Sequence, residues 1–407
     1  MESIMTESGL GSEPEPSPLD LSFTNTEIAF SSKSNSELKN TYRLFKLMNN
    51  SRLVSIGSVL TLWAVKLRIP FINYLIKKTI FSQFCGGENL LDCQTTIDRL
   101  YDFNTLTILD YGAEGKSDEE DLDAVLEENM RALEMAASNN SVPIVSVKIT
   151  GLVDNEVLEN LQKNGSLSTP DQVKYDRLLE RMYALCEKAN ELRVGIFIDA
   201  EESWIQKPID TLALELMKEY NKDFCVVYNT YQMYRHDKLA QLMQDHVWAM
   251  GENVVFGAKM VRGAYLEKEN ERAVELGYKS PIQPDKASTD RDFNAALKYC
   301  IENYQTISSC CASHNLESNR YQAELINDKN LDKTHPHLNF SQLYGMSDYI
   351  TFNLADAGYN VAKYVPYGSV REVMPYLIRR AQENTSITGD MSRELSLIDK
   401  EMKRRGI

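Results

Sequence analysis

The stretch YLIRRAQEN, residues 376–384, places two adjacent arginines near a tyrosine and a glutamate. A helix turns about 100° per residue, so one arc of about 100° contains four polar side chains, those of Tyr376, Arg379, Arg380 and Glu383. Two guanidinium groups on one face could bind a small carboxylate through paired N–H donors. A solvated polar face gives the same pattern, so the choice between the two interpretations depends on the rest of the chain.

A second group of polar residues follows short apolar runs elsewhere in the chain. Asp110, Asp199, Asn229, Arg262, Ser313 and His314 end or directly follow these runs, while Lys148, Lys259 and Tyr364 lie within them. Each alone has an ordinary structural explanation, since an aspartate after a strand often caps a helix and a buried lysine often pairs with an acid. Lys148 lies among apolar residues, so its ammonium needs an anion, which Asp199 could supply. The recurrence at successive runs favours a functional site.

The runs that position these residues are β-rich, and helical patterns separate most of them. The expected strands are 106–110, 143–150, 194–199, 224–229, 254–261, 308–314, 339–345 and 360–366. The expected helices include 118–139, 171–193, 207–221, 232–250 and 288–306. This alternation predicts an α/β fold, a distorted (β/α)8 TIM barrel, with a doubly wound open sheet as the alternative. The carboxyl ends of the strands meet at one mouth of such a barrel, so we expect the polar side chains to lie together there.

Four segments are expected along the chain. Residues 1–36 are rich in Ser, Glu and Pro and predict a disordered acidic tail, and residues 37–104 predict an N-terminal helical arm. The barrel is expected over 105–395, followed by a C-terminal tail over 396–407. Pro375 lacks a backbone donor, so the helix that carries the two arginines either begins just before it or kinks there.

The composition restricts the classes of partner. The 407 residues carry 44 basic and 59 acidic side chains, a net charge of −15, which argues against nucleic acid as the main partner. The longest apolar run, 54–65, is too short to span a bilayer. Residues 1–21 resemble neither a signal peptide nor a mitochondrial presequence. We therefore expect a cytoplasmic protein, or a mitochondrial one if the amino terminus was trimmed.

Several common chemistries lack their motifs. Seven cysteines without a C-x-x-C pair argue against a zinc ribbon and a disulfide framework, and they fit a reducing compartment. The five histidines show no metal-ligand spacing, so no metal is predicted, and His314 could equally be a core histidine. No G-x-S-x-G, P-loop or G-x-G-x-x-G motif occurs, and the absence of the last argues against a Rossmann cofactor domain.

Seven segments in colinear order are similar to those of the proline dehydrogenases, flavoenzymes built on a (β/α)8 barrel. They are VSVKITGL, FIDAEES, VVYNTYQ, AKMVRGAY, ASHN, QLYGMSD and YVPYGSVREVMPYLIRRAQENTS, within about 105–395. The motifs KMVRGAY and YLIRRAQEN are the most specific of these. The chain resembles the monofunctional form of bacteria and mitochondria more than proline utilization A, the bifunctional relative that adds an aldehyde dehydrogenase domain.

The resemblance implies a binding site for L-proline. Arg379 and Arg380 would hold its carboxylate, with Lys148 as a third cation. Glu383 would hold one of the arginines, and Tyr376 would pack on the proline ring. Tyr364 would close the pocket beside the carbon that is hydroxylated in 4-hydroxyproline. Asp199 would neutralise and position the lysine, and together with Lys259 it is a candidate catalytic residue.

The resemblance also implies FAD across the strand ends. The positions that would contact it are Ala200, Asn229, Lys259, Val261, Arg262, Gly263, Ser313 and His314. Neutral proline would give hydride from C5 to flavin N5, 1-pyrroline-5-carboxylate would leave, and the electrons would pass to a membrane quinone, ubiquinone or menaquinone, through a peripheral contact at the inner membrane. Lys259 and Arg262 stand where the bifunctional relatives carry arginine and lysine, and Asn229 replaces a longer glutamine. These choices indicate the subtype and leave the partner of N5 open.

Two other functions fit the same scaffold. One is a 4-hydroxyproline dehydrogenase, and the other is a catalytically silent barrel that acts as a scaffold or proline sensor. The intact set of cationic and flavin-side residues argues against a silent barrel. The intact Tyr364 favours proline over hydroxyproline as substrate.

Overall fold

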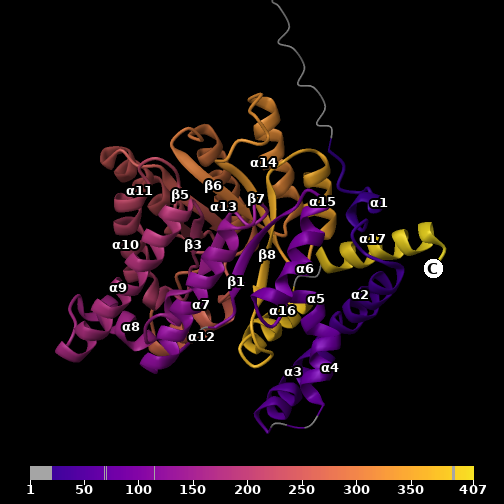
Figure 1. Ribbon diagram of the computed structural model, residues 1–407, viewed down its shortest axis with the longest axis horizontal. Coiled ribbons are helices and arrows are strands. Elements are labelled where there is room, and N and C mark those ends of the chain that lie inside the picture. Colours follow the sequence, from indigo (N-terminus) through magenta and orange to yellow (C-terminus); the bar gives the residue numbers. More distant parts are fainter. Residues whose placement is uncertain (1–20, 68, 70, 114, 387–389) are drawn as a thin grey trace, which may run out of the picture.

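The computed structural model describes residues 21–67, 69, 71–113, 115–386 and 390–407. Eight parallel strands form a closed barrel in chain order, surrounded by helices (Figure 1). The strands are β1 (Leu106–Tyr111), β2 (Ile144–Val147), β3 (Gly195–Ile198), β4 (Val227–Gln232), β5 (Phe256–Val261), β6 (Ile307–Ala312), β7 (Leu338–Leu343) and β8 (Val361–Tyr367). The predicted (β/α)8 barrel is therefore confirmed, and the open-sheet alternative is wrong.

Helices cover the outside of the barrel, so most strand residues are buried on both faces. The barrel interior is filled by alternate strand residues, among them Ile108, Ile144, Phe197, Tyr228 and Tyr364. The covering helices that follow the strands are α7 (Glu119–Ala137), α8 (Asn155–Asn164), α9 (Thr169–Leu192), α10 (Ser203–Tyr220), α11 (Lys238–Glu252), α12 (Leu266–Leu276), α13 (Lys286–Glu302), α14 (Leu316–Asp328), α15 (Asp348–Asp356) and α16 (Met374–Ser386).

The two ends of the described chain pack against each other beside α15. Helices α1 (Thr26–Ala29) and α2 (Asn35–Met48) both contact α17 (Asp390–Arg405), and Phe23 and Phe30 are buried. The predicted disorder is therefore wrong for residues 21–36, and residues 1–20 lie outside the described part. The expected C-terminal tail is also wrong, because residues 396–405 belong to α17.

The predicted helical arm comprises α3 (Ser51–Lys66), α4 (Ile72–Ile76), a π-helical turn (Lys77–Phe81), α5 (Ser82–Phe84) and α6 (Leu90–Tyr101), besides α2. Its second half is joined to the barrel, since the Gly86 amide donates to the carbonyl of Pro366 at 2.9 Å. A Cβ atom at Gly86 would overlap the Val365 side chain, so the close approach of this loop to β8 requires glycine. Helix α3 instead packs against α16.

Helix α16 leaves the carboxyl end of β8 after a short loop and carries the two adjacent arginines. It begins at Met374, so Pro375 occupies the first turn, where a missing N–H is tolerated. The sequence left open a helix start or a kink at this proline, and the structure has the helix start. The two arginines therefore lie in a helix that begins shortly after the carboxyl end of β8.

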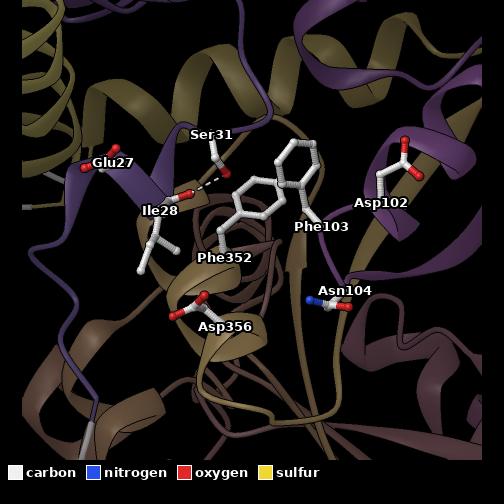
Figure 2. Close-up of a pocket in the computed structure, with 8 residues that line it drawn as sticks. All are labelled: Glu27, Ile28, Ser31, Asp102, Phe103, Asn104, Phe352 and Asp356. Atoms are coloured by element: carbon white, nitrogen blue, oxygen red, sulfur yellow. Dashed lines mark hydrogen bonds between the residues drawn. The ribbon is translucent and has the colours of Figure 1, made fainter.

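A cavity of about 230 Å³ lies at the other end of the barrel (Figure 2). Phe103 and Asn104 precede β1, while Phe352 and Asp356 lie in the second half of α15, which precedes β8. None of the predicted site residues lines this cavity. The predicted site residues lie instead mostly at the carboxyl ends of the strands.

Candidate active site

Asp199 is the centre of a hydrogen-bonded cluster at the carboxyl ends of the strands. It follows β3 directly, and its carboxylate accepts hydrogen bonds from Lys259 Nζ of β5 at 2.5 Å and from the Tyr364 hydroxyl of β8 at 2.5 Å. Ser146 of β2 adds a third hydrogen bond at 2.9 Å and also contacts the Tyr364 hydroxyl at 3.0 Å. Three predicted site residues from three strands are thus brought together.

Lys148 joins this cluster through a carboxylate that the sequence argument did not pair with it. Lys148 follows β2 directly, and its Nζ lies 2.5 Å from Asp110 of β1 and 3.7 Å from Asp199. The expected pairing of Lys148 with Asp199 is therefore the longer of two contacts, and the nearest cation to Asp199 is Lys259. Two carboxylates and two ammonium groups balance one another in the mouth.

The protonation states follow from this arrangement. Burial acts to raise the pKa of Asp199, but attraction from Lys259 and Lys148 and the hydrogen bonds from Lys259 and Tyr364 lower it to about 2. Burial raises the pKa of Tyr364 well above its usual value, and the nearby carboxylates of Asp110 and Asp199 add to this. Asp199 is thus an anion and Tyr364 a neutral donor at physiological pH. Asp199 holds its neighbours in place and is poorly suited to accept a proton.

The polar face of α16 is not a solvated surface. The side chains of Tyr376 and Arg380 are 8 % and 6 % exposed, and the Arg380 guanidinium lies 5.2 Å from the centre of the Tyr376 ring. Arg379 is half-buried. The buried guanidinium agrees with the interpretation of this face as a binding surface. Glu383 lies within α16, but its side chain is outside the described part of the structure.

Arg262 and Ser313 form a second polar group at the mouth, across β5 and β6. Arg262 follows β5 and donates to Ser313 Oγ at 2.6 Å and to Asp290 of α13 at 2.8 Å. Its guanidinium also lies 4.3 Å from the centre of the Phe293 ring. These contacts fix a cation beside the strand ends, where an anionic group of a ligand can be bound.

His314 follows Ser313 and faces the loop before α15. Its Nδ1 lies 2.9 Å from Ser347 Oγ. Burial lowers the pKa of His314 to about 3, and the positive charges of Lys363, Arg380 and Arg262 add to this effect. The imidazole is therefore neutral, and the influence of Arg380 places α16 near this edge of the mouth.

Strand β4 differs from the predicted strand by three residues. Asn229 is its third residue and not its last, and the Asn229 amide donates to Asp210 of α10 at 3.0 Å. The side chain therefore points into the layer between β4 and α10, which corrects the prediction that Asn229 faces the mouth. Gln232 ends β4 and pairs with Val261 of β5. The apolar run alone places the strand end at Asn229, so the sequence pattern does not indicate Gln232 as a residue of the mouth.

The remaining predicted positions lie on the backbone around the mouth. Ala200 follows Asp199, Val261 ends β5, and Gly263 has a φ of +135°. A Cβ atom at Gly263 would come within 2.5 Å of the Tyr234 ring, so this glycine is required by the positive φ and by the aromatic neighbour.

Fold and site together define a class: an α/β barrel whose mouth holds ordered cations and carboxylates. The family model described as Proline dehydrogenase matches residues 93–393. The chain therefore belongs to the proline dehydrogenase family of oxidoreductases, as its motifs predicted.

Named relatives agree with this assignment. The chain is 34% identical over 380 residues to "Proline dehydrogenase 1, mitochondrial" of Dictyostelium discoideum, covering 82% of this chain and 66% of that protein. It is 30% identical over 366 residues to "Hydroxyproline dehydrogenase" of Xenopus laevis, covering 81% and 78%. A crystal structure of proline utilization A from Bdellovibrio bacteriovorus, inactivated by N-propargylglycine, has the same fold, with a TM-score of 0.69, 21% identity, and coverage of 88% of this chain and 38% of that one.

Proposed function

We propose that this chain oxidises L-proline to 1-pyrroline-5-carboxylate, with FAD as first electron acceptor and a membrane quinone as the final one. The net reaction removes a hydride from C5 and a proton from the ring nitrogen, which leaves a C5=N double bond. The observation that supports it best is the cluster of Asp199, Lys259 and Tyr364 in the mouth of a proline dehydrogenase-family barrel, whose last strand leads into α16 with its two arginines.

The residues present suit a bound FAD. Gln232 is buried at the carboxyl end of β4, and its Oε1 atom has no hydrogen-bond partner among the described residues. A buried carbonyl oxygen without a donor is unfavourable, and an N–H group of a ligand would satisfy it. Arg262, with Ser313 and His314 beside it, offers polar groups for an anionic part of the cofactor. Bound FAD supplies the two-electron acceptor of the reaction.

Arginine side chains suit the carboxylate of proline. A planar guanidinium donates two parallel hydrogen bonds to a carboxylate, and the fork of Arg379 and Arg380 is proposed to do so, with Lys148 as a third cation. Tyr376 is proposed to pack on the proline ring, and the Arg380 guanidinium lies 5.2 Å from the centre of the Tyr376 ring. Glu383 is proposed to hold one of the arginines. Asp199 is proposed to keep Lys259 and Tyr364 in fixed positions around the substrate.

A membrane quinone requires contact with a bilayer. Among the residues that the structure describes, no helix has both the length and the apolarity needed to span a membrane. We therefore propose a peripheral contact at the inner membrane, in which the barrel stays in the aqueous phase.

An anaerobic titration tests the proposed reaction. The purified protein should be yellow, and L-proline should bleach the flavin absorbance without oxygen or added nicotinamide. A colourless protein that FAD cannot reconstitute would contradict the proposal, as would a protein that requires NAD. The same titration with trans-4-hydroxy-L-proline distinguishes the second candidate, which the Xenopus relative brings into consideration. A higher kcat/KM for hydroxyproline would assign the chain to that activity.

A further inference from the structure

Helices α3 and α4 expose large apolar side chains. The exposed members are Leu53, Trp63, Leu67, Ile69, Phe71, Tyr74 and Leu75, here called the α3–α4 face. Phe71 is 82 % exposed and Leu67 is 65 % exposed. Figure 1 shows the two helices projecting from the lower edge of the molecule. So many apolar side chains in one exposed segment mark an interaction surface.

The same segment is the most basic part of an acidic protein. Eight of the 44 basic residues and none of the 59 acidic residues lie between Leu38 and Gly87. Arg52 and Lys78 are exposed at the two ends of the α3–α4 face. The remainder of the chain is strongly acidic, so this segment is the part that an anionic surface attracts.

The α3–α4 face also lies next to the candidate active site. Helix α3 packs against α16, the helix that carries Arg379 and Arg380 and follows the mouth of the barrel. A lipid surface bound to this face would therefore lie close to the site whose electrons it is to receive. A second protein copy is a poorer occupant, because two such faces would bring basic segments together.

We propose that the α3–α4 face docks this protein on a membrane surface that contains anionic lipid. The apolar side chains enter the interfacial region, and the basic side chains lie near the headgroups. Helix α3 has 16 residues and α4 has 5, so both lie along the surface and do not cross it. The inference deepens the proposed electron transfer to a quinone and rests on it for its biological meaning.

Vesicle flotation of the full-length holoenzyme tests the docking. The vesicles contain phosphatidylcholine alone or about one third phosphatidylglycerol. Binding is expected with the anionic vesicles and should weaken at high salt. The double variant Leu67→Ser/Phe71→Ser should lower the partition coefficient at least about tenfold, because two large apolar side chains are lost. The variant Arg52→Gln/Lys78→Gln should lower it about thirtyfold on anionic vesicles and leave it unchanged on neutral ones.

Helix α12 provides a matched control. Leu276 and Val274 are 61 % and 83 % exposed, close to the values for Leu67 and Phe71, but they lie in an acidic helix. The variant Leu276→Ser/Val274→Ser should bind vesicles like the unaltered protein. An equal loss of binding in both double variants would overturn the proposal. So would a change from oligomer to monomer, measured by light scattering, in Leu67→Ser/Phe71→Ser without any change in vesicle binding.

A soluble dye separates this inference from the proposed function. Proline-dependent reduction of the dye needs the active site but no membrane, so it should be unchanged in Leu67→Ser/Phe71→Ser, while reduction of a quinone embedded in vesicles falls. Absence of dye reduction in the unaltered protein would contradict the proposed function and leave the vesicle result to be judged on its own. Normal quinone reduction by the double variant would overturn the docking.

Discussion

Of the two neighbouring arginines on α16, Arg380 is buried and Arg379 is half-buried. Arg380 is 6 % exposed, and such a buried cation is stable only with partners that compensate its lost hydration. The substrate carboxylate is the anion proposed for this pair. Each arginine should therefore be needed for substrate binding.

Replacing either arginine by methionine tests this pairing. Arg379→Met and Arg380→Met should each lower kcat/KM for proline roughly 30-fold to several thousandfold, because losing one partner of a buried charge pair costs about 2–5 kcal/mol. The FAD content should stay normal. Arg320→Met, at a partly exposed arginine of α14 that pairs with Glu317, is the control and should keep full activity. Near-normal kinetics of either α16 variant would contradict the role of that arginine.

Tyr364 lies in the middle of β8 and not at its end, yet its hydroxyl reaches Asp199. A wall fitted to a ring hydrogen leaves no space for an added oxygen, so crowding by hydroxyproline should cost about 1–3 kcal/mol. The unaltered protein should prefer L-proline to trans-4-hydroxy-L-proline. Tyr364→Ser should narrow the difference, mainly by losing proline activity. Tyr364→Phe keeps the aromatic ring that closes the pocket, so it should keep the preference for L-proline. Measuring kcat/KM for both substrates on the three proteins tests these expectations.

The neutral His314 makes stability depend on pH. Its pKa is lowered to about 3 by burial and by Lys363, Arg380 and Arg262, against the attraction of Asp348. The unfolded chain takes up this proton near pH 6.5, so the stabilisation is complete above about pH 6.5 and decreases as the pH falls toward 3. When the pH falls from about 7.5 to about 5, the unfolding free energy of His314→Asn should decrease by about 1–2 kcal/mol less than that of the unaltered protein. Equal pH slopes for both proteins would contradict this assignment.

At the scale of the elements, the apolar runs predict all eight strands but do not predict the bounds of every strand. The segment FCVVYNTYQ is longer than the strand it contains, and β4 is buried on both faces. Polar and apolar residues therefore do not alternate along this strand, and the pattern does not show which side chains face the barrel interior. The apolar run predicts a strand end at Asn229, whereas the strand ends at Gln232. Most of the other predicted polar residues lie at the carboxyl ends of their strands, because they end or directly follow shorter runs.

The corrected register of β4 leads to opposite expectations for two amides. Asn229 donates to Asp210 and accepts from the Thr230 amide, so Asn229→Leu should lower the unfolding free energy by about 1–3 kcal/mol. Gln232→Leu removes an unpaired oxygen and one hydrogen bond, so its stability should change little while FAD affinity falls about tenfold. Urea unfolding and FAD titration measure the two effects. Loss of FAD affinity in Asn229→Leu alone would restore the original prediction.

The segments at the chain ends were missed for a different reason. Residues 21–36 place Phe23 and Phe30 in a polar stretch without periodicity, so nothing local predicts a packed element. Their burial comes from tertiary contacts, because α1 packs on α15 and α17. Such contacts join parts of the chain that are hundreds of residues apart and leave no local pattern.

At the scale of the whole molecule, these chain ends are connected to the barrel mouth. Arg405 of α17 donates to the carbonyl oxygens of Phe30 and Lys33, and the Lys33 ammonium lies 3.3 Å from Asp348. Asp348 in turn lies 2.9 Å from Lys363 of β8, the residue before Tyr364. A continuous polar network therefore joins the carboxyl terminus to the strand that carries a site residue.

Arg405 should accordingly stabilise the whole fold. Its guanidinium donates to Glu401, whose side chain is fully buried, as well as to the two backbone carbonyls. Arg405→Ala removes these hydrogen bonds, although Arg404 still donates to Glu401 and the Lys33 amide to Phe30, and should lower the unfolding free energy by about 1.5–3 kcal/mol. Lys403→Ala is the matched control on the same helix, because its ion pair with Asp399 is exposed and worth at most about 1 kcal/mol. Urea denaturation of the two variants measures the difference. Equal midpoints would show that the contact between the chain ends adds nothing to the stability of the barrel.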